Sequence, residues 1–215
     1  MFPKRLTDGY QAFLKGRFPA ERSRYEALAE TGQRPEILII SCCDSRVSPE
    51  AIFDVGPGEL FVVRNVANLV PPCEPDADSS FHGTSAAIEF AVNGLEVKHI
   101  VVMGHASCGG IRSYYDDAEP LSKMDFIGKW MSQIAPVADA LGDSTGDRAQ
   151  DLKRLELAVI GHSLANLMTF PSISRRVKSG ALQLHGCYFG VATGVLFVRD
   201  EASGVFAPCL ETQPG

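Results

Sequence analysis

The sequence predicts an α/β fold with a central, mostly parallel β-sheet flanked by helices and preceded by an N-terminal helical arm. Short apolar runs rich in β-branched residues occupy 37–40, 60–63 and 99–103, a composition that favours buried parallel strands. Segments with apolar residues at helical spacing lie between and after these runs, and such alternation is typical of a parallel sheet. The sequence contains no fixed-period repeat, so we predict a single domain over residues 1–215.

The N-terminal arm is expected to comprise residues 1–32, and the α/β core residues 33–215. The first 30 residues have the pattern of one or two polar helices that carry aromatic side chains such as Tyr10 and Tyr25. This segment lies outside the alternation of strands and helices. Packing on a partner subunit and covering the sheet of its own chain are both consistent with it.

Further elements follow from the same periodicities. Apolar residues at helical spacing predict helices, the last of which is expected to end before Pro171. A turn-rich segment at 71–80 is predicted to be a surface loop. The predicted helices span 83–92, 122–141 and 148–168, and two more strands are expected at 181–187 and 194–199.

The charge balance argues against a nucleic-acid partner. The chain has 26 acidic and 20 basic residues, a net charge of -6, and no block rich in Lys or Arg. Its apolar runs are far shorter than the roughly 18 residues that a membrane span requires. We therefore expect a small-molecule substrate and neither a nucleic acid nor a membrane as partner.

Cysteine usage and the N-terminal segment favour a cytoplasmic location. Met1–Phe18 carries scattered charges and lacks the apolar centre of a secretory signal. Six unevenly spaced cysteines without such a signal are better explained as thiols and metal ligands than as a disulfide framework.

Two clusters of metal-binding residue types follow two of the predicted strands. Ser41–Arg46 follows the first strand and Gly104–Gly110 the third, at the carboxyl ends where α/β sheets bind ligands. If the backbone stays extended through Arg46, then Cys42, Asp44 and Arg46 point one way and Cys43 the other.

His105 and Cys108 complete a metal-binding set with Cys42. They are three residues apart, so they share one face if the glycine-rich turn opens a helix. Two thiolates and one imidazole suit Zn²⁺, and three protein ligands leave the fourth tetrahedral position for water, as in catalytic zinc sites.

Asp44 has two alternative roles. It is a candidate fourth ligand, which closes the metal site. Alternatively, Arg46 holds the Asp44 carboxylate by charge-assisted hydrogen bonds, which leaves the site open.

On these residues the sequence resembles a β-class carbonic anhydrase. The resemblance rests on the C-x-D-x-R motif at Cys42–Arg46 and the H-x-x-C motif at His105–Cys108. It extends through Gly58–Asn68 and Gly83–Glu89 and covers residues 33–198. It implies reversible hydration of carbon dioxide to bicarbonate by hydroxide on Zn²⁺, with Asp44 and Arg46 as catalytic residues.

The resemblance also implies an assembly and a substrate pocket. Family members are dimers or higher homo-oligomers in which the N-terminal arm lies over the neighbouring subunit. Gln33, Phe61 and Phe90 match the substrate-binding positions of the plant-like branch, where Phe90 replaces a tyrosine. Gln33 is expected to reach the pocket across the dimer interface.

Two alternatives are also compatible with the sequence. The same zinc scaffold could hydrolyse carbon disulfide or carbonyl sulfide. A non-catalytic protein that responds to bicarbonate or to redox state, with Cys42 and Cys43 as a thiol pair, is the alternative from a different class. The Asp44–Arg46 pair argues against the second, because a sensor needs no carboxylate that orients hydroxide.

Overall fold

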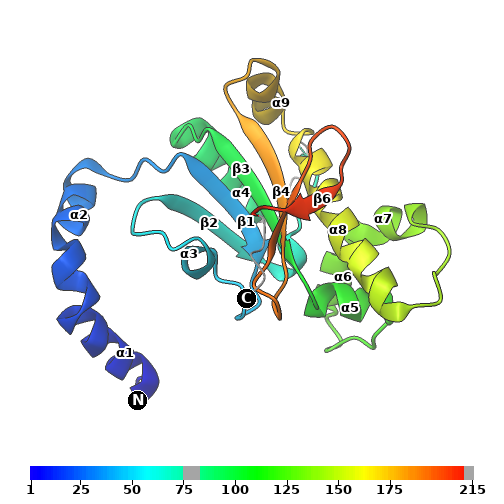
Figure 1. The fold of residues 1–215 in the computed structure, drawn as a ribbon, viewed down its shortest axis with the longest axis horizontal. Helices are drawn as coiled ribbons and strands as arrows, with labels where there is room; N and C mark the ends of the chain where they lie inside the picture. The colour runs from blue at the N-terminus through cyan, green and yellow to red at the C-terminus, as the bar shows by residue number, and fades with distance from the viewer. Residues whose placement is uncertain (75–82, 211–215) are drawn as a thin grey trace.

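The computed structural model describes residues 1–74 and 83–210 and contains a six-stranded sheet flanked by helices (Figure 1). The strands lie in the order β2-β1-β3-β4-β5-β6. β2, β1, β3 and β4 are parallel, whereas β5 pairs antiparallel with β4 and β6 with β5. The predicted α/β class is confirmed. The strand bounds are β1 Ile37–Cys42, β2 Leu60–Asn65, β3 His99–His105, β4 Gln183–Phe189, β5 Leu196–Arg199 and β6 Phe206–Pro208.

Helices alternate with the parallel strands, as predicted. None of the helices in the described part of the chain is long and apolar enough to cross a membrane. The helices are α1 Lys4–Lys15, α2 Arg17–Thr31, α3 Pro49–Ile52, α4 Gly83–Glu89, α5 Gly109–Tyr115, α6 Phe126–Met131, α7 Ala135–Ala140, α8 Arg148–Leu167 and α9 Pro171–Lys178. The 3-10 turns are η1 Val66–Asn68 and η3 Ser132–Ile134, and η2 Phe90–Gly94 is a π-helical turn that continues α4.

One predicted helix is divided in the structure, and helix α9 was not predicted. The single helix expected at 122–141 is divided into α6, η3 and α7. Asp125 caps the start of α6, and Pro136 lies in the first turn of α7, where its missing N–H costs no hydrogen bond. Pro171 likewise starts α9 after α8 has ended, a helix that the sequence pattern does not predict.

The loop predicted at 71–80 is only partly described. Residues 71–74 have no regular secondary structure, and residues 75–80 lie outside the described residues.

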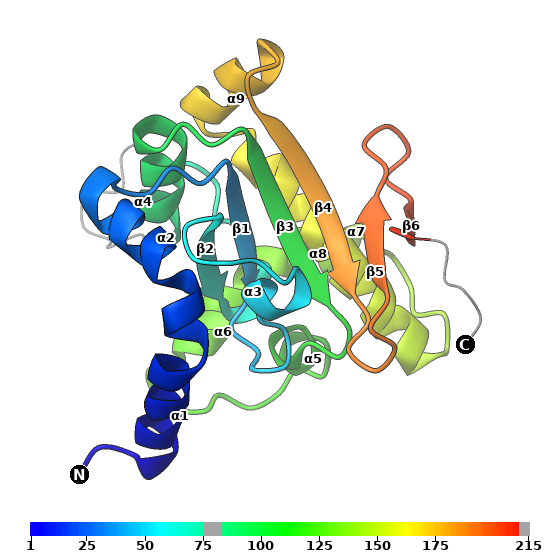
Figure 2. The same ribbon diagram turned by 60° about the vertical axis from the view of Figure 1, so that its left-hand side comes forward.

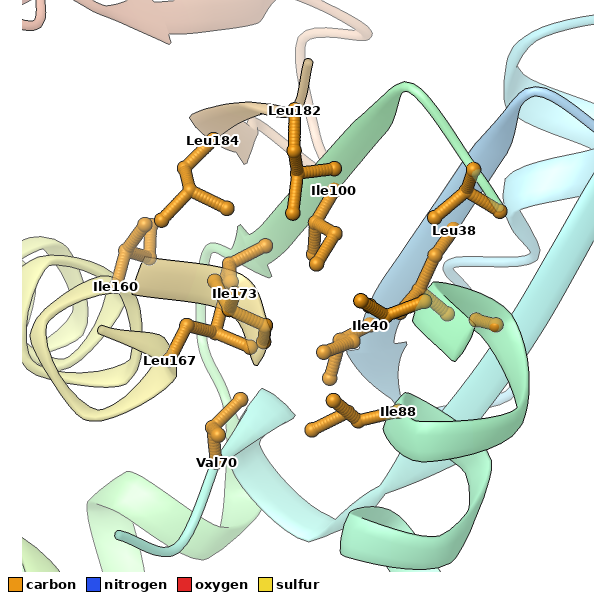
Figure 3. Packing of buried hydrophobic residues seen from close by; sticks show 14 of the residues in the cluster. Leu38, Ile40, Val70, Ile88, Ile100, Ile160, Leu167, Ile173, Leu182 and Leu184 are labelled. Carbon is orange, nitrogen blue, oxygen red and sulfur yellow. The ribbon is translucent and has the colours of Figure 1, made fainter. Parts of the chain in front are cut away.

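The main hydrophobic core lies between one face of the sheet and helices α4, α8 and α9. Ile160 and Leu167 of α8 and Ile173 of α9 point toward the strand residue Ile100 (Figure 3). These side chains are fully buried, and each contributes roughly 1.5–3 kcal/mol through burial. This packing fixes α8 against β3 and thereby positions the carboxyl end of that strand.

The other face of the sheet has a smaller cover within the chain. Ile39, Met103 and Cys187 form its buried cluster, against which Ile52 of the short helix α3 packs, with Phe53 directly after it. Further along the same sheet, Val198 of β5 is 38% exposed.

The N-terminal arm, α1 and α2, projects beside the β2 edge of the molecule (Figure 2). Neither helix has a buried residue. Its aromatic side chains cluster with one another, since Phe13 lies 5.6 Å from Phe18 and 6.0 Å from Tyr25 between ring centroids. An ion pair from Arg24 to Glu59 connects α2 to the turn before β2.

Candidate metal centre

The side chains of Cys42, His105 and Cys108 converge on one point. Their ligand atoms all lie within 4.8 Å of one another, and the two sulfur atoms are 4.0 Å apart. All three residues are buried. The sequence predicted that these three side chains would converge, although Cys42 and Cys108 are 66 residues apart in the chain.

Neighbouring parallel strands bring the three ligands together. Cys42 is the last residue of β1 and His105 the last residue of β3, and these strands pair directly. Cys108 is the N-cap residue of α5. The prediction that His105 and Cys108 share one face of a helix was wrong. A tight turn lies between them, and Ser107 in this turn has a left-handed φ of 58°.

The ring of His105 presents its Nε2 atom to the cluster. Nδ1 lies 3.0 Å from the carbonyl oxygen of Ala106, and because a carbonyl can only accept, Nδ1 carries the proton. Nε2 therefore keeps a free lone pair. It is buried and has no hydrogen-bond partner among the residues that the structure describes.

The two thiols are in hydrogen-bond contact and shift each other's pKa in opposite directions. A hydrogen bond from Cys108 lowers the pKa of Cys42 to about 4, and backbone N–H groups of Asp44 and Ala67 assist. The same hydrogen bond, together with burial, raises the pKa of Cys108. Burial lowers the pKa of His105, but the adjacent Cys42 outweighs it, so that the pKa is raised.

This donor set fits Zn²⁺. The cluster offers two sulfur ligands and one imidazole lone pair without a hydrogen-bond partner, and a cation would neutralise its charge. The group contains no carboxylate, so in this arrangement the chain supplies three of the four ligands that tetrahedral Zn²⁺ takes.

Asp44 is held by Arg46 and not by the cluster. Arg46 donates from Nε to Asp44 Oδ1 at 2.9 Å and from Nη2 to Oδ2 at 2.7 Å, and its backbone N–H also donates to Oδ1. These donors keep the pKa of Asp44 well below its usual value. The premise of an extended backbone through Arg46 was wrong, because residues 45 and 46 form a turn.

Two further residues, neither of them predicted from the sequence, hold the backbone of the site. Arg64 donates to the carbonyl oxygens of Cys42 at 2.9 Å and of Asp44 at 2.7 Å. The backbone N–H of Cys108 donates to Oε1 of Glu156 at 3.0 Å. Arg64 could have been found from the sequence, because it lies in the next predicted strand after Cys42. Glu156 gave no such signal, because it lies 48 residues from its partner Cys108.

Cys43 does not belong to the cluster. It is exposed, whereas Cys42 is buried. It lines a cavity of about 520 Å³ together with Val66 and Trp130. The predicted divergence of the two neighbouring cysteines therefore holds even though the strand ends at Cys42.

Gln33, Phe61 and Phe90 lie apart from the metal cluster of the same chain. Phe61 pairs with Leu38, four residues before Cys42, which places it about 13 Å away along the strands. The rings of Phe61 and Phe90 are 5.8 Å apart, and Phe90 is 53% exposed. Gln33 is exposed in the segment between α2 and β1.

Comparisons with known proteins agree on one family. The family model described as carbonic anhydrase matches residues 37–196. The chain is 38% identical over 186 residues to β carbonic anhydrase 5, chloroplastic, of Arabidopsis thaliana, covering 84% of this chain and 59% of that protein. It is 36% identical over 210 residues to a carbonic anhydrase of Pseudomonas aeruginosa, covering 96% of this chain and 91% of that protein. The chain thus spans about three fifths of the Arabidopsis relative.

Solved structures share the fold over almost the whole chain. The β-carbonic anhydrase CcaA superposes with a TM-score of 0.85 at 31% identity, covering 97% of this chain and 92% of that one. One of two tetrameric β-carbonic anhydrases from Sordaria macrospora superposes with a TM-score of 0.76 at 28% identity, covering 94% and 97%.

Proposed function

This chain belongs to the β-class carbonic anhydrases, and on that premise we propose that it catalyses the reversible hydration of carbon dioxide to bicarbonate. The observation that carries the proposal is the buried Cys42, His105 and Cys108 cluster with an arginine-held carboxylate beside it. A structural zinc site needs a fourth protein ligand and has no use for such a carboxylate.

Zinc is the cofactor of this family, and Cys42, His105 and Cys108 are positioned to hold it. When bound at such a site, zinc lowers the pKa of a coordinated water molecule to about 7 and so supplies hydroxide at neutral pH. The chain's own residues then have to orient the nucleophile and the substrate.

Asp44 is the orienting group in our proposal. Arg46 keeps its carboxylate ionised, and an ionised carboxylate can only accept hydrogen bonds. It therefore accepts from the nucleophile's O–H group and directs the oxygen lone pair toward the carbon of carbon dioxide. Asp44 is 18% exposed, so its carboxylate is not shut off from solvent beside the cluster.

A closed form of the site follows from the same pair. If Arg46 released Asp44, the carboxylate could take the fourth position on the metal. We propose that this exchange switches the site between an open and a shut state. The bidentate contact with Arg46 favours the open state.

We propose that the active unit is a homodimer or a higher homo-oligomer. The resemblance implies that Gln33, Phe61 and Phe90 contact the substrate, yet they lie apart from the metal cluster of their own chain. A second copy that supplies them would account for both. The arm without buried residues and the less covered face of the sheet are further surfaces that a second copy could cover. The family's structures include the tetrameric enzymes from Sordaria macrospora.

We further propose one domain over residues 1–215 and a cytoplasmic location. One sheet contains all the strands of the described residues, which supports a single domain. All six cysteines are free thiols, as expected in a reducing compartment. Fractionation of the source cells with an antibody to the protein tests the location.

Stopped-flow measurement of carbon dioxide hydration, run alongside zinc analysis, tests the proposed activity. We expect about one zinc per chain and turnover that is lost together with zinc in Cys42→Ser. Cys43→Ser is the matched control, because Cys43 is exposed and outside the cluster, and it should keep both. Full zinc content and activity in Cys42→Ser would refute the ligand assignment. Parallel assays with carbon disulfide and carbonyl sulfide identify the preferred substrate.

A further inference from the structure

The peptide group between Ser107 and Cys108 is held at both ends by side chains from distant parts of the chain. Its carbonyl oxygen accepts a hydrogen bond from Nη2 of Arg46 at 3.1 Å. Its N–H group donates to Oε1 of Glu156 at 3.0 Å. The same Nη2 atom of Arg46 also donates to Asp44. One peptide group thus connects the Asp44–Arg46 pair to Glu156 on α8.

Glu156 is an unusual residue for its surroundings. It is 4% exposed, and its neighbours on the same helix include the buried apolar residues Leu155 and Val159. Burial of a carboxylate is costly unless its oxygens are hydrogen-bonded. Both oxygens are: the second, Oε2, accepts from the hydroxyl group of Tyr188 at 2.7 Å. Tyr188 is itself 4% exposed, on β4. Packing alone would be served better by an apolar side chain.

The backbone at this point needs support. Ser107 has a φ of 58°, a left-handed conformation that is unfavourable for residues other than glycine. Such a conformation persists only where the surroundings enforce it. A flip of the peptide would turn its carbonyl oxygen toward the oxygens of Glu156 and its N–H toward the donors of Arg46. Both contacts would then be repulsive, so the two side chains together select one orientation.

The orientation of this peptide determines where the Cys108 sulfur atom lies. Cys108 follows the turn immediately, and its sulfur is 4.0 Å from that of Cys42. The other side of the same peptide fixes the guanidinium group of Arg46 over Asp44. A shift of the peptide would therefore disturb a metal ligand and the orienting carboxylate together.

We propose that Glu156, locked by Tyr188, is a positioning residue that holds the Ser107–Cys108 peptide and thereby sets both the Cys108 ligand and the Arg46 clamp on Asp44. This inference rests on the proposed zinc site. Partners of this kind behind metal ligands typically change metal affinity about 10- to 100-fold when they are lost.

Zinc affinity, measured by competition with a chromophoric chelator, tests the proposal, together with the visible spectrum of the Co²⁺-substituted protein. Glu156→Leu removes both hydrogen bonds at similar volume, and we expect a loss in zinc affinity of about 10- to 100-fold with an altered cobalt spectrum. Glu156→Gln retains an acceptor for Cys108 and should restore most of the affinity. Tyr188→Phe frees one carboxylate oxygen and should give a smaller loss.

Ser163→Ala is the matched control. Ser163 is a buried polar residue on the same helix, and its hydroxyl bonds the backbone of Asn68 and Val70 instead of the 107–108 turn. It should lower thermal stability and leave zinc affinity and the cobalt spectrum unchanged.

Wild-type protein is measured first, so that a failure of the proposed function can be distinguished from a failure of the proposed role of Glu156. A wild type that takes up no zinc would overturn the proposed function. A wild type that holds zinc, beside a folded Glu156→Leu of equal affinity and spectrum, would overturn only the role of Glu156. The same follows if Ser163→Ala weakens zinc binding as much as Glu156→Leu. If Glu156→Leu does not fold, Tyr188→Phe decides, and an unchanged affinity in that variant contradicts the proposal.

Discussion

Arg46 grips Asp44 through two side-chain hydrogen bonds, one to each carboxylate oxygen, at 2.9 and 2.7 Å. The pair sits at the carboxyl end of β1, beside the Cys42 ligand. The backbone N–H of Arg46 also donates to Asp44. Because all three donors belong to Arg46, the position of the carboxylate depends on the local turn as well as on charge.

Asp44→Asn should retain zinc and lose turnover. The Asn side chain has one acceptor atom, whereas the Asp carboxylate has two. We therefore expect a fall in kcat/KM of about 100-fold or more. The measurement is stopped-flow hydration with parallel zinc analysis. Asp116→Asn is the matched control, because Arg148 holds Asp116 in a similar pair away from the metal cluster, and it should keep full activity. A variant at Asp44 that retained wild-type turnover would remove this residue from the mechanism.

Hybrid oligomers test whether Gln33 acts across a subunit interface. Cys42→Ser lacks one ligand, and Gln33→Ala lacks the proposed substrate contact. In a hybrid dimer of the two variants, the intact metal cluster meets the intact Gln33 only if Gln33 acts on the neighbouring chain. Isolated hybrids, purified with two different tags, should then show about half of the wild-type activity, as expected for one intact site in two.

The parent homodimers are the controls for this experiment. Cys42→Ser should be inactive and Gln33→Ala impaired. Hybrid activity no higher than half that of the Gln33→Ala homodimer would place Gln33 in the site of its own chain.

Asp151 should make stability depend on acidic pH. Donors from Ser144 and from the backbone of Thr145 lower the pKa of this carboxylate below its usual value. A lowered pKa in the folded state means that stability is fully present above the unfolded value of about 3.9 and is lost as pH falls below it toward the folded value. Asp151→Asn should therefore lower the thermal midpoint at neutral pH, and the difference from wild type should shrink below about pH 4.

Thermal unfolding from pH 7 to pH 2.5 measures this effect. Asp143→Asn removes a charge from an exposed neighbour and should shift the midpoint little at any pH. A difference between Asp151→Asn and wild type that stayed constant over this range would contradict the assignment.

Gly104 should not tolerate a methyl group. A Cβ atom at this position would lie 2.7 Å from Cδ1 of Ile160. Gly104→Ala should destabilise the fold by about 1–3 kcal/mol, and combination with Ile160→Val should recover part of this loss. Urea denaturation of the single and double variants measures both terms. Gly161→Ala is the control. A Cβ atom there would have no contact closer than 4.0 Å, and the position is helical, so this variant should be neutral or stabilising. Additive effects of Gly104→Ala and Ile160→Val on the free energy of unfolding would argue against the clash.

The metal ligands were predictable from sequence because each follows a short apolar run. Such runs form neighbouring parallel strands, whose carboxyl ends meet, so Cys42 and His105 come together without any knowledge of the loops. The turn at Ser107 was not predictable, because a serine in the left-handed region has no sequence signal of its own. Its position depends on Arg46 and Glu156, which are distant in the chain.

The helix boundaries within 122–141 could not be predicted from the sequence pattern either. Apolar periodicity continues through this segment, while the capping by Asp125 and the restart at Pro136 depend on local hydrogen bonds. In our proposal, Phe61 and Phe90 meet a catalytic centre only through a second copy of the chain, and no periodicity within one sequence encodes such a relation. Glu156 was missed because it lies in a helix whose buried positions otherwise suggest plain packing.

The arm formed by α1 and α2 holds its shape through contacts that water can reach, such as the Lys4–Asp8 and Arg24–Glu59 pairs. Exposed pairs of this kind each contribute well under about 1 kcal/mol. An isolated protomer should therefore open at this end first, with rapid amide exchange and early protease cleavage between residues 4 and 31, while the sheet stays closed. Because Gln33 lies two residues after the end of α2, the same fraying would withdraw it from any neighbouring pocket, so that dilution of the enzyme would weaken catalysis before it weakened the fold.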